Sequence, residues 1–282
     1  MKVTEPGIYA GIPNDVYHSD PTEKGSLSVS GAKKLLPPYT PEHYKHDREN
    51  PEHKDAFDFG SAAHRIVLEK TEDGIAEVKA ENWMTKAAKE AKAEAHNAGK
   101  YPLLTKELAE VRAMARRIQE HPLAGPVFSV GDPEQSAFAV DEQTGVWKRG
   151  RFDWLPPIDS SRRLIIPDYK TARSAAPRPF ARAVADYRYH MQAAWYSDLI
   201  TEMGLHADVA FVFVVQEKTA PYAVNVFTLD ADAIATGRDL NRKAIDRFAH
   251  CQQTGEWPGY AGVTEISLPT YATYEFEDIL ND

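Results

Sequence analysis

The sequence predicts a mixed α/β, or α+β, fold with a mixed central sheet flanked by helices and a helical N-terminal region. The second half of the chain holds alternating or apolar segments of strand length at 135–140, 145–154, 164–170, 209–216 and 222–229. Long helix-forming segments lie between and after these strands, at 179–203 and 230–254. We therefore expect a single domain over residues 1–282, mainly helical over 1–125 and sheet-containing over 126–282.

Caps and helix breakers define the first elements. Ser28 precedes the short segment 32–36, and Pro37-Pro38 follows it, so we expect a serine-capped helix that ends at the proline pair. Residues 58–69 are typical of a helix rich in small residues, which is able to pack closely against a neighbour.

Two more helices are expected before the sheet. Residues 82–96 are rich in Ala, Lys and Glu and favour a solvated helix, for which a lid, an interface and a plain spacer all stay open as roles. Thr105 is expected to cap the next helix, which ends at His121-Pro122. One apolar face of that helix is formed, at helical spacing, by Leu108, Val111, Ala115 and Ile118.

The second half of the chain alternates between strands and helices. The apolar segment 164–166 leads directly into Pro167-Asp168, so this strand is expected to be buried. Gly204 ends the first long helix, and Asp230 opens the second. Beyond Trp257 we expect irregular chain.

Composition and charge limit the functional classes. Hydrophobic residues make up 43% and charged residues 27% of the chain, as in an ordinary globular protein. The formal net charge of −9 argues against a general nucleic-acid coat, but an enzyme with acidic metal ligands is compatible with it. With no hydrophobic segment at the N-terminus, no membrane-length apolar run and Cys251 as single cysteine, we expect a soluble cytoplasmic protein.

Acidic residues and a lysine come together on two successive predicted strands. Side chains alternate along a strand, so Asp168 and Lys170 point to one face and Tyr169 to the other. If the strands that carry Asp153 and Asp168 pair as a hairpin, the two carboxylates lie alongside each other. Mg²⁺ binds through one or two carboxylates and substrate phosphates, and a lysine supplies positive charge near the phosphate or the attacking water.

The same residues also have a simpler interpretation. Asp-x-Lys is common at solvated strand edges, where an ion pair contributes about 0–1 kcal/mol. The apolar segment that precedes Asp168 favours the functional interpretation, because it places the acid at the end of a buried strand.

The pattern Asp153 and Asp168-Tyr169-Lys170 resembles the core of the PD-(D/E)XK nuclease superfamily. His64, after Gly60, is similar to the Gly-x-x-x-His element of the RecB-like branch, and Gln192 to Tyr196 is similar to its Gln-x-x-x-Tyr element. More narrowly, three further segments resemble the RecE-like exonucleases: Tyr17-His18, residues 26–36 and Trp257-Pro258-Gly259-Tyr260.

The resemblance implies roles for individual residues. It makes Asp153, Asp168, His64 and the Tyr169 backbone carbonyl metal ligands, and it makes Lys170 the group that activates water and stabilises phosphate charge. Its further catalytic positions correspond to Glu134, Gln192 and Tyr196.

Alternatives stand beside these roles. Asp132, Asp141 and Glu142 compete with Glu134 as the extra acid. A histidine on a helix is more often packed or exposed than a ligand, and Gln192 and Tyr196 are also compatible with simply capping the sheet.

Arginines gather around the proposed centre in an otherwise acidic chain. If these arginines contact the phosphates of DNA, the DNA-binding residues are Arg149, Arg151, Arg173, Arg178, Arg182 and Arg188. The alternative is a set of solvated arginines paired with the many carboxylates.

As a whole, the resemblance implies a single nuclease domain that is a Mg²⁺-dependent double-stranded DNA exonuclease, with Mn²⁺ able to substitute. It implies 5′-to-3′ resection of duplex ends, which leaves 3′ single strands for a single-strand annealing protein. It also implies a closed homo-oligomer, a ring such as a trimer or tetramer, in the cytoplasm of a bacterial host, with a phage or prophage origin.

Two alternatives stay open. One is a related endonuclease or single-strand-specific nuclease with the same residues. The other is a non-catalytic module that binds DNA ends or a partner, which the presence of Asp153, Asp168 and Lys170 disfavours.

Overall fold

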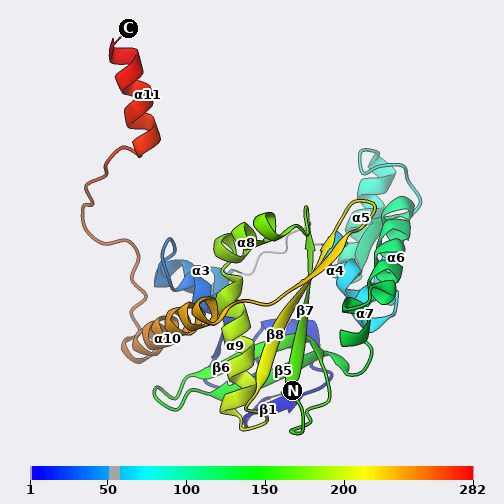
Figure 1. Cartoon of the computed structure of the whole chain (residues 1–282), viewed down its shortest axis with the longest axis horizontal. Coiled ribbons are helices and arrows are strands. Elements are labelled where there is room, and N and C mark those ends of the chain that lie inside the picture. The colour runs from blue at the N-terminus through cyan, green and yellow to red at the C-terminus, as the bar shows by residue number, and fades with distance from the viewer. Residues whose placement is uncertain (1, 51–57, 282) are drawn as a thin grey trace.

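Two larger mixed sheets meet at the centre of the computed structural model, which describes residues 2–50 and 58–281 (Figure 1). The first sheet has the order β1 (Gly7–Tyr9), β5 (Asp132–Val140), β6 (Trp147–Leu155), β2 (Ser26–Ser28). The second has the order β7 (Leu164–Ala172), β8 (Val209–Glu217), β9 (Val224–Phe227). A separate parallel pair is formed by β3 (Ile75–Val78) and β4 (Tyr101–Leu104).

Helices surround these sheets and connect them. The N-terminal half contains α1 (Asn14–His18), α2 (Val29–Lys34), α3 (Pro41–Glu49), α4 (Asp58–His64), the π-helical turn η2 (Arg65–Glu69), α5 (Lys86–Asn97), α6 (Thr105–Glu120) and α7 (Ala124–Val127). The C-terminal half contains α8 (Pro177–Asp186), α9 (Tyr189–Glu202), α10 (Ala231–Thr254) and α11 (Thr270–Asn281). Over the described residues, no helix combines the length and the apolar character that crossing a bilayer requires.

The mixed α/β architecture is confirmed, and so are several helix boundaries. Ser28 Oγ accepts a hydrogen bond from the Gly31 N–H at 3.2 Å and caps α2. Asp230 Oδ1 caps α10 in the same way, 2.7 Å from the Ala233 nitrogen. Helix α5 has the solvated composition that was expected of it, with only Ala88 and Ala95 buried.

The hairpin that would bring the two acid-bearing strands together does not form, since β6 and β7 belong to different sheets. Strand β7 instead pairs in parallel with β8, from Leu164 opposite Val209 to Ala172 opposite Glu217. The first half of β6 already has partners on both edges, β5 and β2. Where β6 and β7 meet, the Tyr169 N–H donates to Asp153 Oδ2 at 2.9 Å, so a side chain joins the two sheets at this seam.

The single helix expected over 179–203 is also wrong, since α8 and α9 are separate. Arg188 interrupts them with a left-handed φ of 52°. Thr105 is the first residue of α6 and not its cap, because the Glu107 carboxylate accepts from the Leu104 N–H at 2.8 Å. Helix α11 and the short strands β1 to β4 were not predicted.

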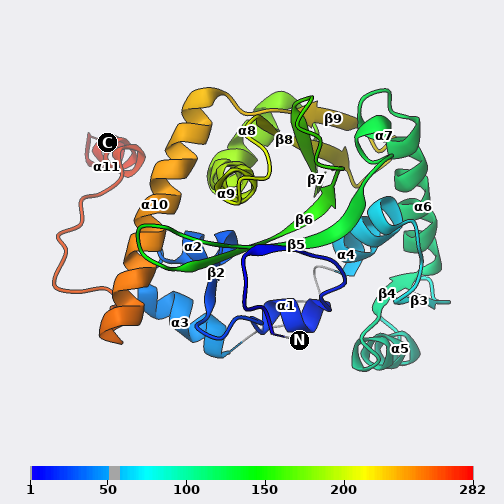
Figure 2. The ribbon, with the colours of Figure 1, turned by 90° about the horizontal axis from the view of Figure 1, so that it is seen from below.

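Two main cores hold the molecule together. The larger core fills the concave side of the sheets and is covered by α9 and α10, as Figure 2 shows, with Phe152, Trp195 and Phe248 in it. The second core lies beneath α4, η2 and α6 and includes the fully buried Tyr169. Both cores border the seam between β6 and β7, so packing on each side fixes the residues that project from it.

Gly237 tests how closely α10 packs on α9. A Cβ at this position would lie 2.3 Å from the His190 carbonyl oxygen, two residues before Gln192. We expect Gly237→Ala to lower the free energy of unfolding by about 1–3 kcal/mol, although helix propensity alone would raise it by about 1 kcal/mol. Urea unfolding measures the difference, with the exposed Thr236→Ala as the control. A Gly237→Ala protein as stable as the parent would contradict the close contact.

Candidate active site

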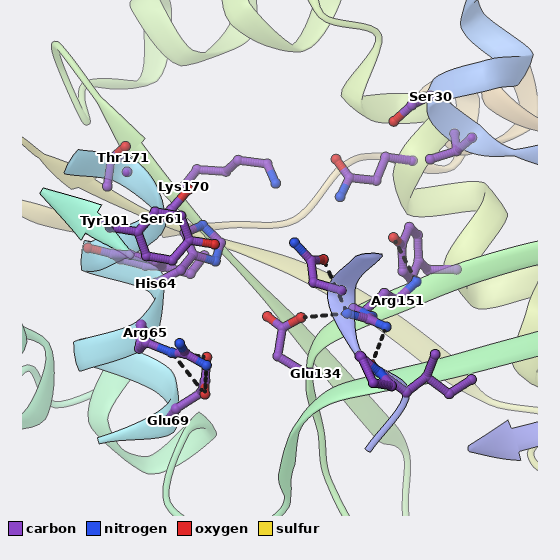
Figure 3. Close-up of a pocket in the computed structure, with 18 of the residues that line it drawn as sticks. Ser30, Ser61, His64, Arg65, Glu69, Tyr101, Glu134, Arg151, Lys170 and Thr171 are labelled. Atoms are coloured by element: carbon purple, nitrogen blue, oxygen red, sulfur yellow. Dashed lines mark hydrogen bonds and ion pairs between the residues drawn. The ribbon is translucent and has the colours of Figure 1, made fainter. Parts of the chain in front are cut away.

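An open cleft of about 820 Å³ runs along the seam between the sheets. One wall is formed by α4 and η2, and the other by the segment around Pro13 and by α2; β7 and α9 contribute residues between them. Figure 3 shows His64, Glu134 and Lys170 with their side chains directed into this space from three different elements.

Two side chains that line the cleft, together with Asp153 beside it, form a group that is able to hold a metal ion. Ligand atoms of His64, Glu134 and Asp153 all lie within 4.8 Å of one another. The strand register pairs Pro133 with Trp154 and Gln135 with Phe152, which sets Glu134 opposite Asp153. Glu134 has a left-handed φ of 52°, an uncommon conformation for a side chain other than glycine.

Asp168 and Lys170 lie beside this group. Lys170 Nζ is 2.5 Å from Asp168 Oδ2, and Gln192 Nε2 donates to Asp168 Oδ1 at 2.7 Å. Tyr169 points the other way, as strand alternation requires, and its hydroxyl donates to Gln216 Oε1 at 2.6 Å inside the core. Asp168 is not one of the three residues in the compact group, so its role as a ligand stays a prediction, as does that of the Tyr169 carbonyl.

Burial and mutual repulsion make the acids hard to ionise. Burial, and then repulsion by the neighbouring Asp153 carboxylate, raise the pKa of Glu134 to about 7. Burial likewise raises the pKa of Asp168 to about 6, although the Lys170 ammonium opposes the shift. The pKa of Asp153 is raised for the same reason.

The pKa values of the two basic groups, His64 and Lys170, are shifted in opposite directions. Burial and then the Lys170 charge lower the pKa of His64 to about 4, so this imidazole is neutral and has a free lone pair for a metal. Burial alone would lower the pKa of Lys170, but the Asp168 and Asp153 carboxylates outweigh it and raise that pKa. Lys170 therefore stays charged.

These residues fit a divalent metal ion. Three carboxylates face one ammonium group, that of Lys170. Asp168 Oδ2 is buried, and among the described residues no donor reaches it in hydrogen-bond geometry, although Lys170 forms an ion pair with it. An added cation would relieve the repulsion that raises the pKa of Glu134 and Asp168. Oxygen-rich donors with one imidazole suit hard or borderline divalent ions. Glu134, Asp153 and His64 would hold it, with Asp168 beside them.

Tyr196 lines the cleft but has a structural contact as well. Its hydroxyl accepts a hydrogen bond from the Arg151 N–H at 3.3 Å, and its ring packs edge-on against Phe152 with centroids 5.1 Å apart. Gln192 reaches the Asp168 carboxylate directly. A substrate contact by either residue stays a prediction.

The six arginines separate into two groups. Three of them contact the N-terminal region: Arg149 lies 2.7 Å from Asp20, Arg151 donates to the Ile12 carbonyl at 2.8 Å, and Arg188 donates to the Lys33 carbonyl at 3.3 Å. Of these, Arg151 also lines the cleft. The exposed ones are Arg173, Arg178 and Arg182. DNA contact by all six stays a prediction, and for Arg149 and Arg188 the structure offers another use.

Lys33 and Tyr189 also line the cleft, and neither was predicted from the sequence as a site residue. Lys33 Nζ lies 5.6 Å from the centre of the Tyr189 ring. Burial, and then repulsion by Lys170, lower the pKa of Lys33 to about 8. The capped helix that carries Lys33 was predicted, but no residue spacing links it to the distant Lys170.

Metal affinity is expected to depend on pH through the acids. Ligands must be deprotonated, so affinity for Mn²⁺ should fall below about pH 7, where Glu134 gains a proton, and fall more steeply below about pH 6, where Asp168 does. His64 is neutral throughout this window and adds no dependence. In Glu134→Gln the decline should start only near pH 6. Calorimetric titration at several pH values measures this.

The matched control is Glu142→Gln, an exposed acid in the turn after β5. It should retain the parent pH profile. An affinity in the parent that stays constant from about pH 8 to pH 5 would contradict the placement of Glu134 and Asp168 at the metal site.

Comparisons with known proteins agree with this geometry. The chain is similar to a crystal structure from Eubacterium rectale of a candidate exonuclease, with 14% identity and a TM-score of 0.59, over 94% of this chain and 98% of that one. At this identity the likeness concerns the fold. A comparison with curated proteins finds no match. Residues 28–268 match the PDDEXK-like domain of unknown function DUF3799. The chain therefore belongs to this PDDEXK-like family, as the arrangement of Asp153, Asp168 and Lys170 indicated.

Proposed function

We propose that the protein is a Mg²⁺-dependent exonuclease that hydrolyses double-stranded DNA from its ends. The observation that carries the proposal is the convergence of five charged or metal-binding side chains: His64, Glu134 and Lys170 line an open cleft, and Asp153 and Asp168 lie directly beside them. Buried acids that repel one another are typical of catalytic sites, and a module that only binds DNA does not require them.

Each residue has a chemical task in the proposed reaction. A bound divalent ion would supply Lewis acidity toward the phosphate. Lys170 keeps its positive charge between two carboxylates and is suited to stabilise negative charge that develops on the phosphate oxygens. Glu134, Asp153 and His64 would hold that ion beside the phosphate. Gln192 orients the Asp168 carboxylate, and Tyr169 orients that of Asp153.

The direction of cleavage, the assembly and the partner are proposed on other grounds than the geometry of the site. The 5′-to-3′ direction, the closed homo-oligomer, the annealing partner and the cytoplasmic, phage-related origin rest on the RecE-like resemblance of the sequence. Action on DNA ends is further supported by the candidate exonuclease from Eubacterium rectale that shares the fold. Mn²⁺ is expected to replace Mg²⁺, because both accept oxygen ligands.

Loss of the central charges should abolish cleavage. We expect Asp168→Asn and Lys170→Ala to lower the rate by at least about 100-fold, because each removes a charge at the reacting phosphate without changing the core. The assay follows release of label from linear duplex DNA labelled at either the 5′ or the 3′ end, in Mg²⁺ and in EDTA. Lys243→Ala, an exposed lysine on α10 outside the cleft, is the control.

The outcomes separate the alternatives. Early release of 5′ label that requires both Mg²⁺ and Lys170 supports the exonuclease and its direction. Cleavage of closed circular DNA by the same protein would favour the endonuclease. Release that is unchanged in Lys170→Ala would contradict the proposed site.

A further inference from the structure

The break between α8 and α9 projects two tyrosines beside the catalytic cleft. Helix α8 ends at Asp186, and α9 begins at Tyr189, so Tyr187 and Arg188 form the connection. Tyr189 lines the cleft, whereas the Tyr187 side chain is 62% exposed. This connection has no part in the reaction described above.

The conformation of this break is held in place at a cost. Arg188 has a φ of 52°, a left-handed conformation that is unfavourable for a residue with a side chain. Its guanidinium donates to the backbone carbonyls of Lys33 and Pro37, which ties the turn to the end of α2. Strain that the surroundings maintain in this way is typical of functional positions.

The two tyrosine rings form one surface with a rigid support. Their centroids are 5.6 Å apart, and the ring planes are tilted by 32°. Behind Tyr189 lie Phe180, at 6.0 Å between centroids, and Phe213, at 5.6 Å. Because Phe180 and Phe213 are both buried, Tyr189 is fixed by the core, while Tyr187 extends the surface into solvent.

Cations lie close to this surface. Lys170 Nζ is 5.3 Å and Lys33 Nζ is 5.6 Å from the centre of the Tyr189 ring. If Lys170 contacts the reacting phosphate, then a nucleotide of the same strand lies within reach of Tyr189. Helix α8 adds the exposed Arg178 and Arg182 on the approach to the break. Aromatic rings beside a row of cations are the arrangement by which proteins bind single-stranded nucleic acid.

We infer that Tyr187 and Tyr189 form a stacking platform for unpaired bases of the DNA strand that is cut. The inference rests on the proposed function and makes it more specific. Inside a duplex the faces of each base are already stacked, so only nucleotides that have left the duplex are able to bind the two rings. The enzyme therefore holds a frayed end, with its bases on the tyrosines and its phosphates on Lys33 and Lys170.

The test compares DNA affinity for paired and unpaired ends in the full-length Asp168→Asn protein, where cleavage does not interfere. The probes are a blunt duplex and the same duplex with three unpaired nucleotides at one end, both followed by fluorescence anisotropy at fixed salt. The Asp168→Asn protein, which serves as the parent here, should bind the frayed duplex more tightly than the blunt duplex. Tyr187→Ala and Tyr189→Ala should each lose about tenfold on the frayed duplex and little on the blunt one.

Conservative and distant variants complete the test. Tyr187→Phe and Tyr189→Phe keep the rings and should bind as the parent does, and so should Tyr274→Ala, an exposed tyrosine on α11. Because Tyr187 is exposed, its substitution tests the platform even if Tyr189→Ala weakens the fold. A frayed-end affinity that is unchanged in Tyr187→Ala, with normal DNA binding, overturns the platform alone. A folded parent that binds neither duplex overturns the proposed function and the platform together.

Discussion

Repulsion between carboxylates at the seam of two sheets is the constraint around which this protein is arranged. Burial raises the pKa of Glu134, Asp153 and Asp168, and repulsion by Asp153 adds to the shift of the other two. One ammonium, that of Lys170, faces them. Such a cluster is stable only if the surrounding structure is rigid enough to prevent the acids from turning to water, or if a cation joins them.

Rigidity comes from the two cores that border the seam. On β7, Tyr169 is fully buried, and its N–H holds Asp153 of the neighbouring sheet. Gln192 holds Asp168 from α9, which lies in the concave side of the sheets under α10. His64 reaches the same point from the end of α4, directly before the π-helical turn η2, a type of turn that is frequent at functional sites.

Much of the fold and of the site was accessible from the sequence. The long strands and α10 follow from their patterns, and strand alternation accounts for Asp168 and Lys170 on one face with Tyr169 in the core. The superfamily indicated by these residues is confirmed by the family match over residues 28–268. Local sequence patterns are therefore sufficient to predict the part of the site whose side chains lie close together on one strand.

The rest depends on contacts between distant segments. The hairpin does not form, because β7 pairs with β8, some forty residues later, and belongs to a different sheet from β6. The break at Arg188 has no local signal such as proline or glycine, because the distant carbonyls of Lys33 and Pro37 stabilise it. Strands of three or four residues, such as β1 and β4, are too short to show a period. Lys33 was not predicted as a site residue, because only the folded chain brings α2 close to Lys170.

The central claim is that a divalent ion completes the cluster of acids. The most direct measurement is anomalous X-ray scattering from crystals of the protein grown with Mn²⁺. The account predicts a Mn²⁺ peak between His64, Glu134 and Asp153, bordered by the Asp168 carboxylate. Crystals with saturating Mn²⁺, an intact cleft and no peak at this position would contradict it.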